Sequence, residues 1–158
     1  MTVVCVKDGF IACDSQVTSA GLKIATTPKL VLITHGRYAG GYTAATGAGV
    51  HCLAFTDWIK NGMIGESPFN ESNYMEDGER SKINGIVVGK WFNPDEYLYS
   101  HNGYTLEDYH GPFIAMGVAR EFALGAMSAG ASAEEAVRLS CDYVSGCGGP
   151  ISVAKYLK

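Results

Sequence analysis

Residues 2–18 of the chain, TVVCVKDGFIACDSQVT, decide how the fold begins. Two short apolar runs, 3–6 and 10–13, flank the dipeptide Asp8-Gly9. Asp-Gly between two such runs is a strong signal for a hairpin with a two-residue turn. Each run is apolar on both faces, which is typical of strands buried between two layers. The sequence therefore predicts an antiparallel hairpin in the interior of the protein.

The rest of the chain separates into strand-forming and helix-forming segments. The acidic stretch 65–82 has few aliphatic residues and predicts a solvated loop. Ser132 and Glu135 predict a capping box at the start of the last helix. The predicted elements are strands at 29–34, 38–45, 83–89, 96–100 and 151–157, and helices at 49–61, 117–129 and 133–144.

This segregation predicts an α+β protein. A chain of 158 residues fits one domain, which we expect to span 1–158. Strands that are apolar on both faces need cover on both sides. We therefore expect two antiparallel sheets face to face between helix layers, a four-layer αββα sandwich.

Composition and charge exclude several classes of protein. Twelve basic and 16 acidic residues give a formal net charge of −4. No basic cluster is evident, so we expect no nucleic-acid partner. No apolar run approaches the roughly 20 residues that span a bilayer, and no signal-peptide pattern is present, so we expect a cytoplasmic protein without membrane contact.

The cysteines and histidines give no sign of a metal site. The five cysteines are odd in number and lie mostly in apolar patterns, which predicts reduced, structural thiols. No CxxC pair occurs, and the four histidines are scattered. The phosphate-binding and dinucleotide-binding glycine motifs are also absent. We expect neither a metal nor a cofactor.

The N-terminus offers an unconventional nucleophile. No GxSxG motif is present, but Thr2 follows Met1, and a small second residue permits removal of the initiator methionine. Removal would leave a hydroxyl and an α-amine on one residue, and an amine with a reference pKa of about 7.7–8.0 can act as a general base. Many proteins begin Met-Thr, so the alternative that Thr2 is an ordinary strand residue stays open.

Asp14 and Lys29 are candidate partners of Thr2. Folding the first hairpin pairs position 3 with position 14, which brings Asp14 within one ladder step of Thr2. A carboxylate in an apolar run needs a partner, and Lys29 is the nearest basic residue in strand order. The pattern also allows Asp14 to cap a turn and Lys29 to be a solvated strand end.

Five segments in order resemble the proteasome β-subunit and HslV family of N-terminal nucleophile hydrolases. The likeness extends over most of the chain and is weakest between 62 and 82. The segments are TVV at 2–4, ACDSQVT at 12–18, Lys29, ATGAG at 45–49 and CDYVSG at 141–146.

The resemblance implies a threonine-type endopeptidase. After loss of Met1, Thr2 would attack a peptide carbonyl through its hydroxyl while its own amine takes the proton. Lys29 would favour the alkoxide form of that hydroxyl, and Asp14 would hold Lys29. The backbone amide of Gly47 would donate to the oxyanion.

The resemblance also implies where the substrate binds. Thr18 would hydrogen-bond the substrate backbone. Val17, Ala45 and Gly49 would line the pocket for the residue before the cut. Because Ala45 and Gly49 are small, we expect a roomy, apolar pocket that accepts bulky side chains.

Two features late in the chain concern the amine of Thr2. By the same resemblance, Asp142 and Ser145 would orient it, although ordinary polarity at the end of a helix would explain both residues equally well. The family usually has Gly-Ser-Gly before this region, whereas 117–119 is Gly-Val-Ala. Val118 thus replaces a serine that helps to position the amine.

The resemblance finally implies an assembly and partners. The subunits would form homo-oligomeric stacked rings, cleave peptides or unfolded proteins, and receive folded substrates from an ATP-dependent unfoldase. Two alternatives stay open. The chain could be a catalytically impaired scaffold or binding subunit, with Val118 as the first sign of decay, or an amidohydrolase acting on a small-molecule amide, since one fold hosts several activities.

Overall fold

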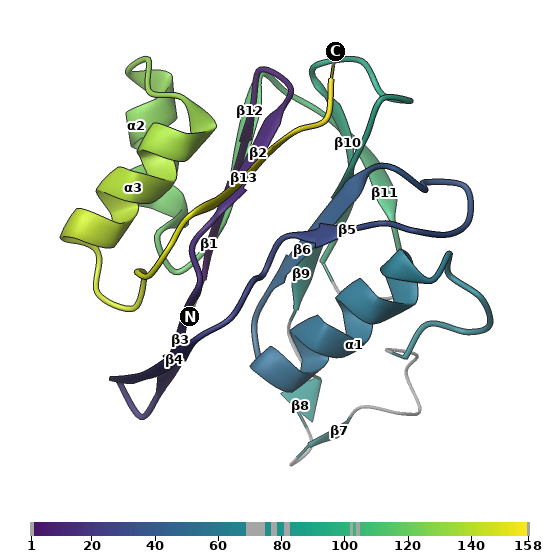
Figure 1. The fold of residues 1–158 in the computed structure, drawn as a ribbon, viewed down its shortest axis with the longest axis horizontal. Helices are drawn as coiled ribbons and strands as arrows, with labels where there is room; N and C mark the ends of the chain where they lie inside the picture. The colour runs from purple at the N-terminus through teal and green to yellow at the C-terminus, as the bar shows by residue number, and fades with distance from the viewer. Residues whose placement is uncertain are drawn as a thin grey trace.

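A computed structural model describes residues 2–68, 75–76, 79–80, 83–101, 103 and 105–157 (Figure 1). Strands and helices are both present, which confirms the α+β class. The elements are β1 Val3–Lys7, β2 Phe10–Cys13, β3 Gln16–Ser19, β4 Leu22–Thr26, β5 Val31–Leu32, β6 Tyr42–Thr46, α1 Gly49–Lys60, β7 Met75–Glu76, β8 Glu79–Arg80, β9 Asn84–Val88, β10 Glu96–Ser100, β11 Glu107–His110, β12 Phe113–Gly117, α2 Arg120–Ser128, α3 Ala133–Tyr143 and β13 Ser152–Lys155.

The predicted N-terminal hairpin is confirmed. β1 and β2 pair antiparallel, with Lys7 opposite Phe10 across a two-residue turn. Asp8 and Gly9 both have positive φ, 51° and 78°, as this turn requires. Beyond the last ladder pair, the Asp14 amide donates to the Val3 carbonyl at 3.3 Å, the register expected from the sequence.

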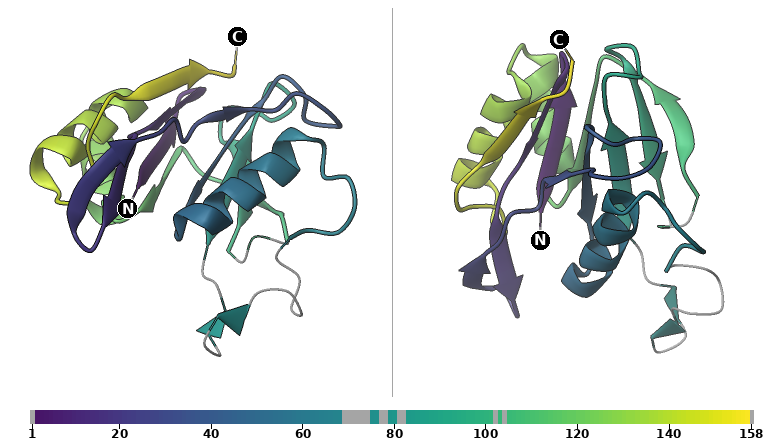
Figure 2. Two further views of the ribbon diagram at one scale, coloured as in Figure 1. Left: turned by 60° about the horizontal axis from the view of Figure 1, so that its bottom comes forward. Right: turned by 45° about the vertical axis from the view of Figure 1, so that its right-hand side comes forward.

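Two larger antiparallel sheets carry the fold. The first has the strand order β12-β1-β2-β13, and the second has the order β11-β10-β9-β6-β5. Both views in Figure 2 place α2 and α3 beside the first sheet and α1 beside the second. Two short hairpins, β3–β4 and β7–β8, form separate two-stranded sheets.

Successive side chains of β1 point to opposite faces of the first sheet and belong to two different core clusters. Val4 and Val6 face the second sheet, where they join a buried cluster with Ile86 and other residues of β6, β9 and β10. Val3 and Cys5 face the opposite way and pack with apolar residues of α2 and α3. This period of two is the pattern of a strand covered on both faces.

α1 covers the other face of the second sheet. Phe55 and Ile59 are buried there against Ala45 of β6 and Val87 of β9. Phe55 fits because Gly85 has no side chain, and a Cβ at Gly85 would overlap the Phe55 ring. Helices thus pack against β5, β6 and β9 of the second sheet and against β1, β2 and β12 of the first.

Several predicted boundaries are wrong. The strand predicted over 29–34 is only Val31–Leu32. The strand predicted over 38–45 begins at Tyr42, because the residues before it form a turn in which the Gly40 amide donates to the Ile33 carbonyl. The helix expected from 117 begins at Arg120, because Gly117 still pairs with Val3 as the last residue of β12. The last strand is Ser152–Lys155 rather than 151–157.

Several strands were not predicted. β3 and β4 form a hairpin in which every residue of β4 is exposed, so no buried apolar period marks it. β12 is an edge strand of the first sheet, and β11 is an edge strand of the second. The acidic stretch 65–82 lies largely outside the described residues, and within it β7 and β8 pair.

The remaining local predictions concern the last helix and the cysteines. The Glu135 amide donates to Ser132 Oγ at 3.1 Å and the Ser132 amide donates to Glu135 Oε2 at 2.8 Å, so the capping box is confirmed.

All five cysteines are free thiols rather than disulfide-bonded. None of the helices in the described ranges is both long and apolar enough to cross a membrane.

Candidate active site

Thr2 lies directly before β1, one of the two inner strands of the first sheet. The residue is only 7% exposed. Its carbonyl accepts a hydrogen bond from the Val118 amide at 3.0 Å. Gly117 makes this contact possible, because its φ is +99° and a Cβ there would collide with the Thr2 carbonyl. The backbone of Thr2 is thus fixed before any substrate binds.

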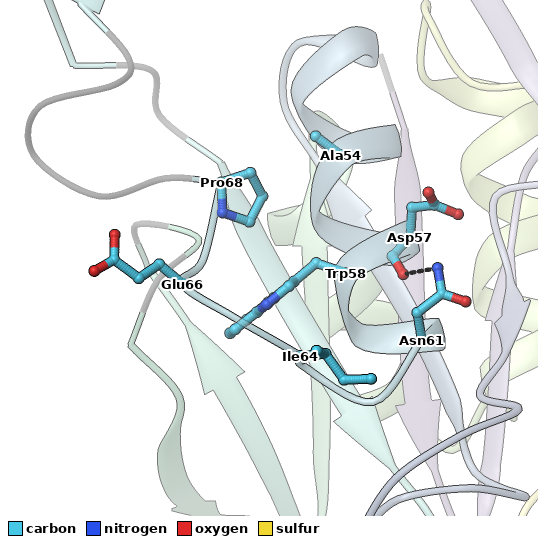
Figure 3. A pocket seen from close by; sticks show the side chains of 7 residues that line it. All are labelled: Ala54, Asp57, Trp58, Asn61, Ile64, Glu66 and Pro68. Carbon is cyan, nitrogen blue, oxygen red and sulfur yellow. Dashed lines mark hydrogen bonds between the residues drawn. The ribbon is translucent and has the colours of Figure 1, made fainter.

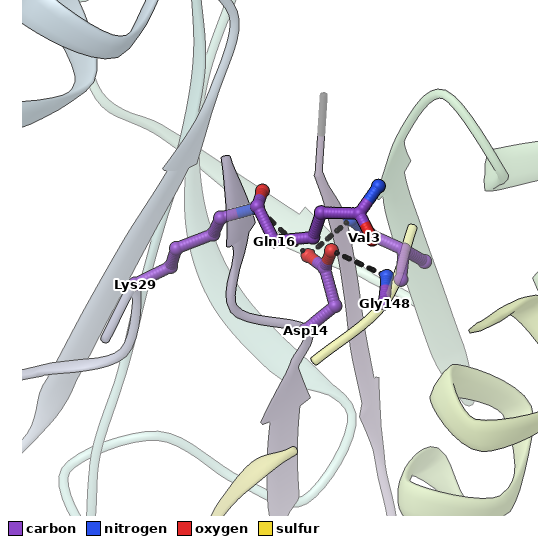
Figure 4. A network of polar contacts seen from close by, with 5 residues as sticks. All are labelled: Val3, Asp14, Gln16, Lys29 and Gly148. Atoms are coloured by element: carbon purple, nitrogen blue, oxygen red, sulfur yellow. Dashed lines mark hydrogen bonds and ion pairs between the residues drawn. The ribbon is translucent and has the colours of Figure 1, made fainter. Parts of the chain in front are cut away.

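The Asp14 carboxylate binds the backbone directly after Thr2, the Lys29 side chain and the segment at Gly148 (Figure 4). The carboxylate is fully buried. Its Oδ1 accepts from the Val3 amide at 3.1 Å and from Lys29 Nζ at 3.0 Å, and its Oδ2 accepts from the Gly148 amide at 3.2 Å. Three donors therefore satisfy a buried charge that would otherwise be costly. The predicted contact between Asp14 and Lys29 is present.

Lys29 approaches from the segment before β5. Its side chain is 12% exposed, and Nζ donates to the Gln16 carbonyl at 2.7 Å as well as to Asp14. Lys29 and Thr2 line the same cavity. A fixed ammonium in that wall would favour an anion on the Thr2 oxygen, because opposite charges stabilise each other strongly in a site of low dielectric constant.

The first cavity, as we call it, has a volume of about 360 Å³. The predicted substrate-binding residues Val17, Thr18, Ala45 and Gly49 all lie in its wall, together with Thr2, Lys29 and Gly47. The structure therefore brings these seven side chains and glycines to one place. The other residues of the wall are Gln16, Thr27, Pro28, Val31, Ala48, Cys52, Leu53 and Thr56.

Part of that wall is one face of α1. Gly49, Cys52, Leu53 and Thr56 recur at intervals of three and four residues, which places them together on a helix surface. This periodicity was available in the sequence and could have added three residues to the predicted pocket.

The turn from β6 into α1 is suited to an oxyanion. Gly47 has a φ of +133°, a conformation that favours glycine. The N-cap residue of α1, Ala48, makes no side-chain capping bond. The N-terminus of a helix carries partial positive charge on its amide groups, so the amides of this turn could donate to an oxyanion.

A second cavity of about 450 Å³ lies on another side of Thr2. Thr2 and Gly47 line both cavities, so they stand between them. Val118, 47% exposed, belongs to this second wall. The complete lining is Thr2, Thr46, Gly47, Asn84, Tyr99, Met116, Gly117, Val118 and Arg120.

Asp142 and Ser145 are not brought into either cavity. Both are exposed, near the C-terminal end of α3. The chain that follows them reaches the site instead, through the Gly148 amide that donates to Asp14. Sequence reasoning missed Gly148, because a backbone donor has no side-chain signature. The orientation of the Thr2 amine by Asp142 and Ser145 stays a prediction.

The cysteine that lines the first cavity is poorly suited to nucleophilic attack. Cys52 lines the first cavity, and burial raises its pKa to about 11. The reactive form of cysteine is the thiolate, so Cys52 is almost wholly a neutral thiol near pH 7. Within the described ranges no group of three or more His, Cys, Asp or Glu residues is placed to hold a metal ion.

A third cavity, of about 330 Å³, lies on the outer side of α1 (Figure 3). Ala54, Asp57 and Trp58 of α1 line it together with Asn61, Ile64, Glu66 and Pro68 of the segment that follows. None of its lining residues is shared with the other two cavities. None of them is a serine, threonine, cysteine or lysine.

Comparison with known proteins identifies the fold. No family model and no curated protein matches the chain. Among solved structures, BPH of Thiobacillus denitrificans in complex with epoxomicin matches 100% of both chains at 22% identity and a TM-score of 0.66. BPH of the same organism in a second structure gives 21% identity, 99% and 98% coverage and a TM-score of 0.66.

A third solved structure agrees with these two. HslV of Trypanosoma brucei matches at 18% identity, 98% coverage of both chains and a TM-score of 0.65. The chain therefore has the fold of HslV and BPH over its whole length. The HslV-like α+β fold expected from the resemblance in the sequence is confirmed, while the four-layer arrangement stays a prediction.

Proposed function

We propose that the protein is a threonine-type endopeptidase of the proteasome β-subunit and HslV family, with Thr2 as its nucleophile after removal of Met1. One observation carries the proposal. The buried Thr2 lines two cavities, and one of them is also lined by Lys29, which is paired with the buried Asp14. We also infer that residues 1–158 form a single domain and that the covered sheets make a four-layer αββα sandwich.

The reaction would proceed through an ester on Thr2. The Thr2 amine, through a water molecule, accepts the hydroxyl proton while Oγ bonds to the carbonyl carbon of the peptide. The charge of Lys29 favours the alkoxide form of Oγ during the attack, and the Gly47 amide stabilises the oxyanion that forms on the carbonyl. When the intermediate collapses, the C–N bond breaks and the proton passes to the leaving amine. Water then hydrolyses the ester and restores Thr2.

The first cavity would bind the residue before the cut. Val17, Ala45 and Gly49 give it apolar and small wall elements, while Thr18 stands beside them. An apolar wall favours an apolar side chain, because burial removes apolar surface from water. Asp142 and Ser145 are proposed to act on the amine, in the mature form that lacks Met1.

We further infer homo-oligomeric rings in the cytoplasm that take unfolded protein from an ATP-dependent unfoldase. Support comes from exposed apolar side chains on β4, which pairs with the cavity-lining strand β3, and on α1, which also lines the first cavity. Leu22 and Ile24 of β4 are 70% and 63% exposed, and Val50 of α1 is 76% exposed. Exposed apolar groups of this kind mark association surfaces when they are contiguous.

A labelling experiment tests the nucleophile. Epoxomicin, the compound in the BPH complex, would be added to chain whose first residue is Thr2, released from a cleavable N-terminal tag. We expect the intact mass to rise by one epoxomicin, with the adduct mapped to Thr2. The Thr2→Ala chain, prepared in the same way, should stay unlabelled. A folded, Thr2-terminal chain that remains unmodified would contradict the proposal.

A second candidate is a catalytically impaired subunit, favoured by Val118. This residue takes the position of a serine and lies in the wall next to Thr2. Labelling that appears only in Val118→Ser would support impairment. A labelled protein that hydrolyses small amides but no peptides would support the amidohydrolase instead.

A further inference from the structure

The proposed reaction leaves the second cavity without a role. We propose that this cavity binds a carboxylate carried by the leaving part of the substrate, and that Arg120 recognises it. The inference rests on the proposed function, because it takes Thr2 as the point where the substrate is cut.

The position of the second cavity follows from the residues it shares. Thr2 and Gly47 would contact the carbonyl under attack, and they line both cavities. A substrate whose acyl side chain occupies the first cavity has its scissile bond at Thr2. The part beyond that bond then extends away from the first cavity, and the second cavity is the space available on that side.

The chemistry of the wall favours an anion. Arg120 is the one charged residue among the described residues that line the cavity. Asn84 contributes an amide, and Tyr99 and Thr46 contribute hydroxyl groups that can donate hydrogen bonds. The planar guanidinium group of arginine matches a carboxylate with two parallel donors.

Arg120 is free to turn toward a ligand. Its side chain is 58% exposed, and its ion pair is with Glu121, 90% exposed, at 3.7 Å. Exposed pairs of that length are weak and are readily exchanged. Arg120 is also the first residue of α2, whose N-cap makes no side-chain bond, so the helix end adds positive charge at the same place.

Tyr99 supplies a second donor near Arg120. It is 7% exposed, and burial raises the pKa of its hydroxyl while the charge of Arg120 acts in the opposite sense. The hydroxyl therefore keeps its proton at neutral pH and can donate. The influence of Arg120 on Tyr99 agrees with their common position in the wall of the cavity.

The first cavity does not have the same preference. Its cation, Lys29, already contacts the buried carboxylate of Asp14 and the Gln16 carbonyl. A substrate carboxylate would have to compete with Asp14 for it. The selection for an anion should therefore act only beyond the scissile bond.

The carboxylate can come from two sources, the side chain of Asp or Glu directly after the cut or the terminal carboxylate of a short leaving peptide. Quenched fluorescent peptides with one apolar residue before the cut separate them. The position after the cut is Glu, Gln or Lys, and each peptide is made with an amidated and with a free C-terminus. The measured quantity is kcat/KM.

We expect the Glu peptide to exceed the Gln peptide by about tenfold, the effect of one charge-assisted contact. Arg120→Gln should remove that ratio and Arg120→Glu should favour Lys instead. The matched control is Arg138→Gln, an exposed arginine on α3 that lines neither cavity, which should keep the ratio. A preference confined to free C-termini would assign the terminal carboxylate as the source.

Equal cleavage of all peptides by the wild-type protein, or a ratio that survives Arg120→Gln, would overturn the role of Arg120 and leave the peptidase intact. If no peptide is cleaved, calorimetry with the Thr2→Ala protein and the tripeptide amides Glu-Ala-Ala and Gln-Ala-Ala decides. Tighter binding of the Glu peptide that is lost in Arg120→Gln keeps the binding site while the peptidase fails. Equal or undetectable binding overturns both.

Discussion

Lys29 and Arg120 are cations in cavities on two sides of Thr2, and the protein holds them differently. Lys29 is 12% exposed and contacts the fully buried Asp14, whereas Arg120 is 58% exposed and meets the exposed Glu121 at 3.7 Å. A lysine held by a buried carboxylate has its charge fixed in one place, while an arginine in a weak surface pair can bind a new partner. The difference suggests that the first cavity is built for chemistry and the second for selection.

Unfolding experiments give the largest expected effect. Lys29→Met leaves the Asp14 carboxylate buried without its cation, which should lower the free energy of unfolding by about 3–5 kcal/mol. Arg120→Met changes a surface pair and should stay within about 0.5 kcal/mol of wild type. Urea denaturation measures both. Similar losses for the two variants would break the contrast between the cations.

The rate of reaction at Thr2 should also depend on Lys29. In a folded Lys29→Met protein at low temperature, the rate of labelling by epoxomicin should fall by about 10²–10³, the effect of losing one preorganised electrostatic group. The double variant Asp14→Asn/Lys29→Met is the control, since it removes the stranded carboxylate and should recover stability without recovering the rate. Recovery of the rate would mean that Lys29 acts only through folding.

Backbone strain at Gly117 gives the next effect. Gly117→Ala places a Cβ against the Thr2 carbonyl at a φ of +99°. We expect a loss of about 1–3 kcal/mol in the free energy of unfolding. Gly125→Ala is the matched control, because this glycine lies within α2 and a Cβ there meets nothing within 4 Å. A neutral Gly117→Ala would show that the N-terminus is less constrained than we infer.

The size of the first cavity can be changed without touching the second. Gly49 begins α1 and lines the first cavity only, and a Cβ at this position would meet nothing within 4 Å. Gly49→Val should lower cleavage after bulky residues relative to alanine by about tenfold, since methylene-scale changes in a pocket have effects of this order. The Glu-to-Gln ratio beyond the cut should not move. A change in that ratio would show that the cavities are coupled.

The smallest effect concerns pH. Because burial raises the pKa of Cys52 to about 11, its thiolate fraction near pH 8 is small and grows about tenfold per pH unit until the pH approaches that pKa. Alkylation of Cys52 by iodoacetamide, followed by peptide mass spectrometry, should rise with the same slope. A bulky apolar ligand of the first cavity should slow it. A rate that is flat between pH 7 and 9 would contradict the buried position of the thiol.

Burial made much of the fold predictable. The apolar runs around Asp8-Gly9 gave the first hairpin its register, and a carboxylate in an apolar run called for a cation such as Lys29. The β3–β4 hairpin was missed because β4 is exposed throughout and is held by strand pairing, which leaves no periodic apolar signal.

The wall of the first cavity was predictable from the sequence in part. The resemblance named Val17, Thr18, Ala45 and Gly49, and all four line the first cavity. Gly148 was missed because its contribution is a backbone amide. Arg120 was missed because an arginine at the start of a helix has the sequence pattern of an ordinary solvated residue. Only the structure shows that it lines the same cavity as Thr2.

The hydrogen bond from the Val118 amide to the Thr2 carbonyl ties the proposed nucleophile to the end of β12, an edge strand of the first sheet. β12 pairs with β1 from Val3–Gly117 to Lys7–Phe113. A displacement of this edge strand along β1 would therefore move Thr2 relative to both cavities, so the position of the nucleophile depends on the register of one strand pair.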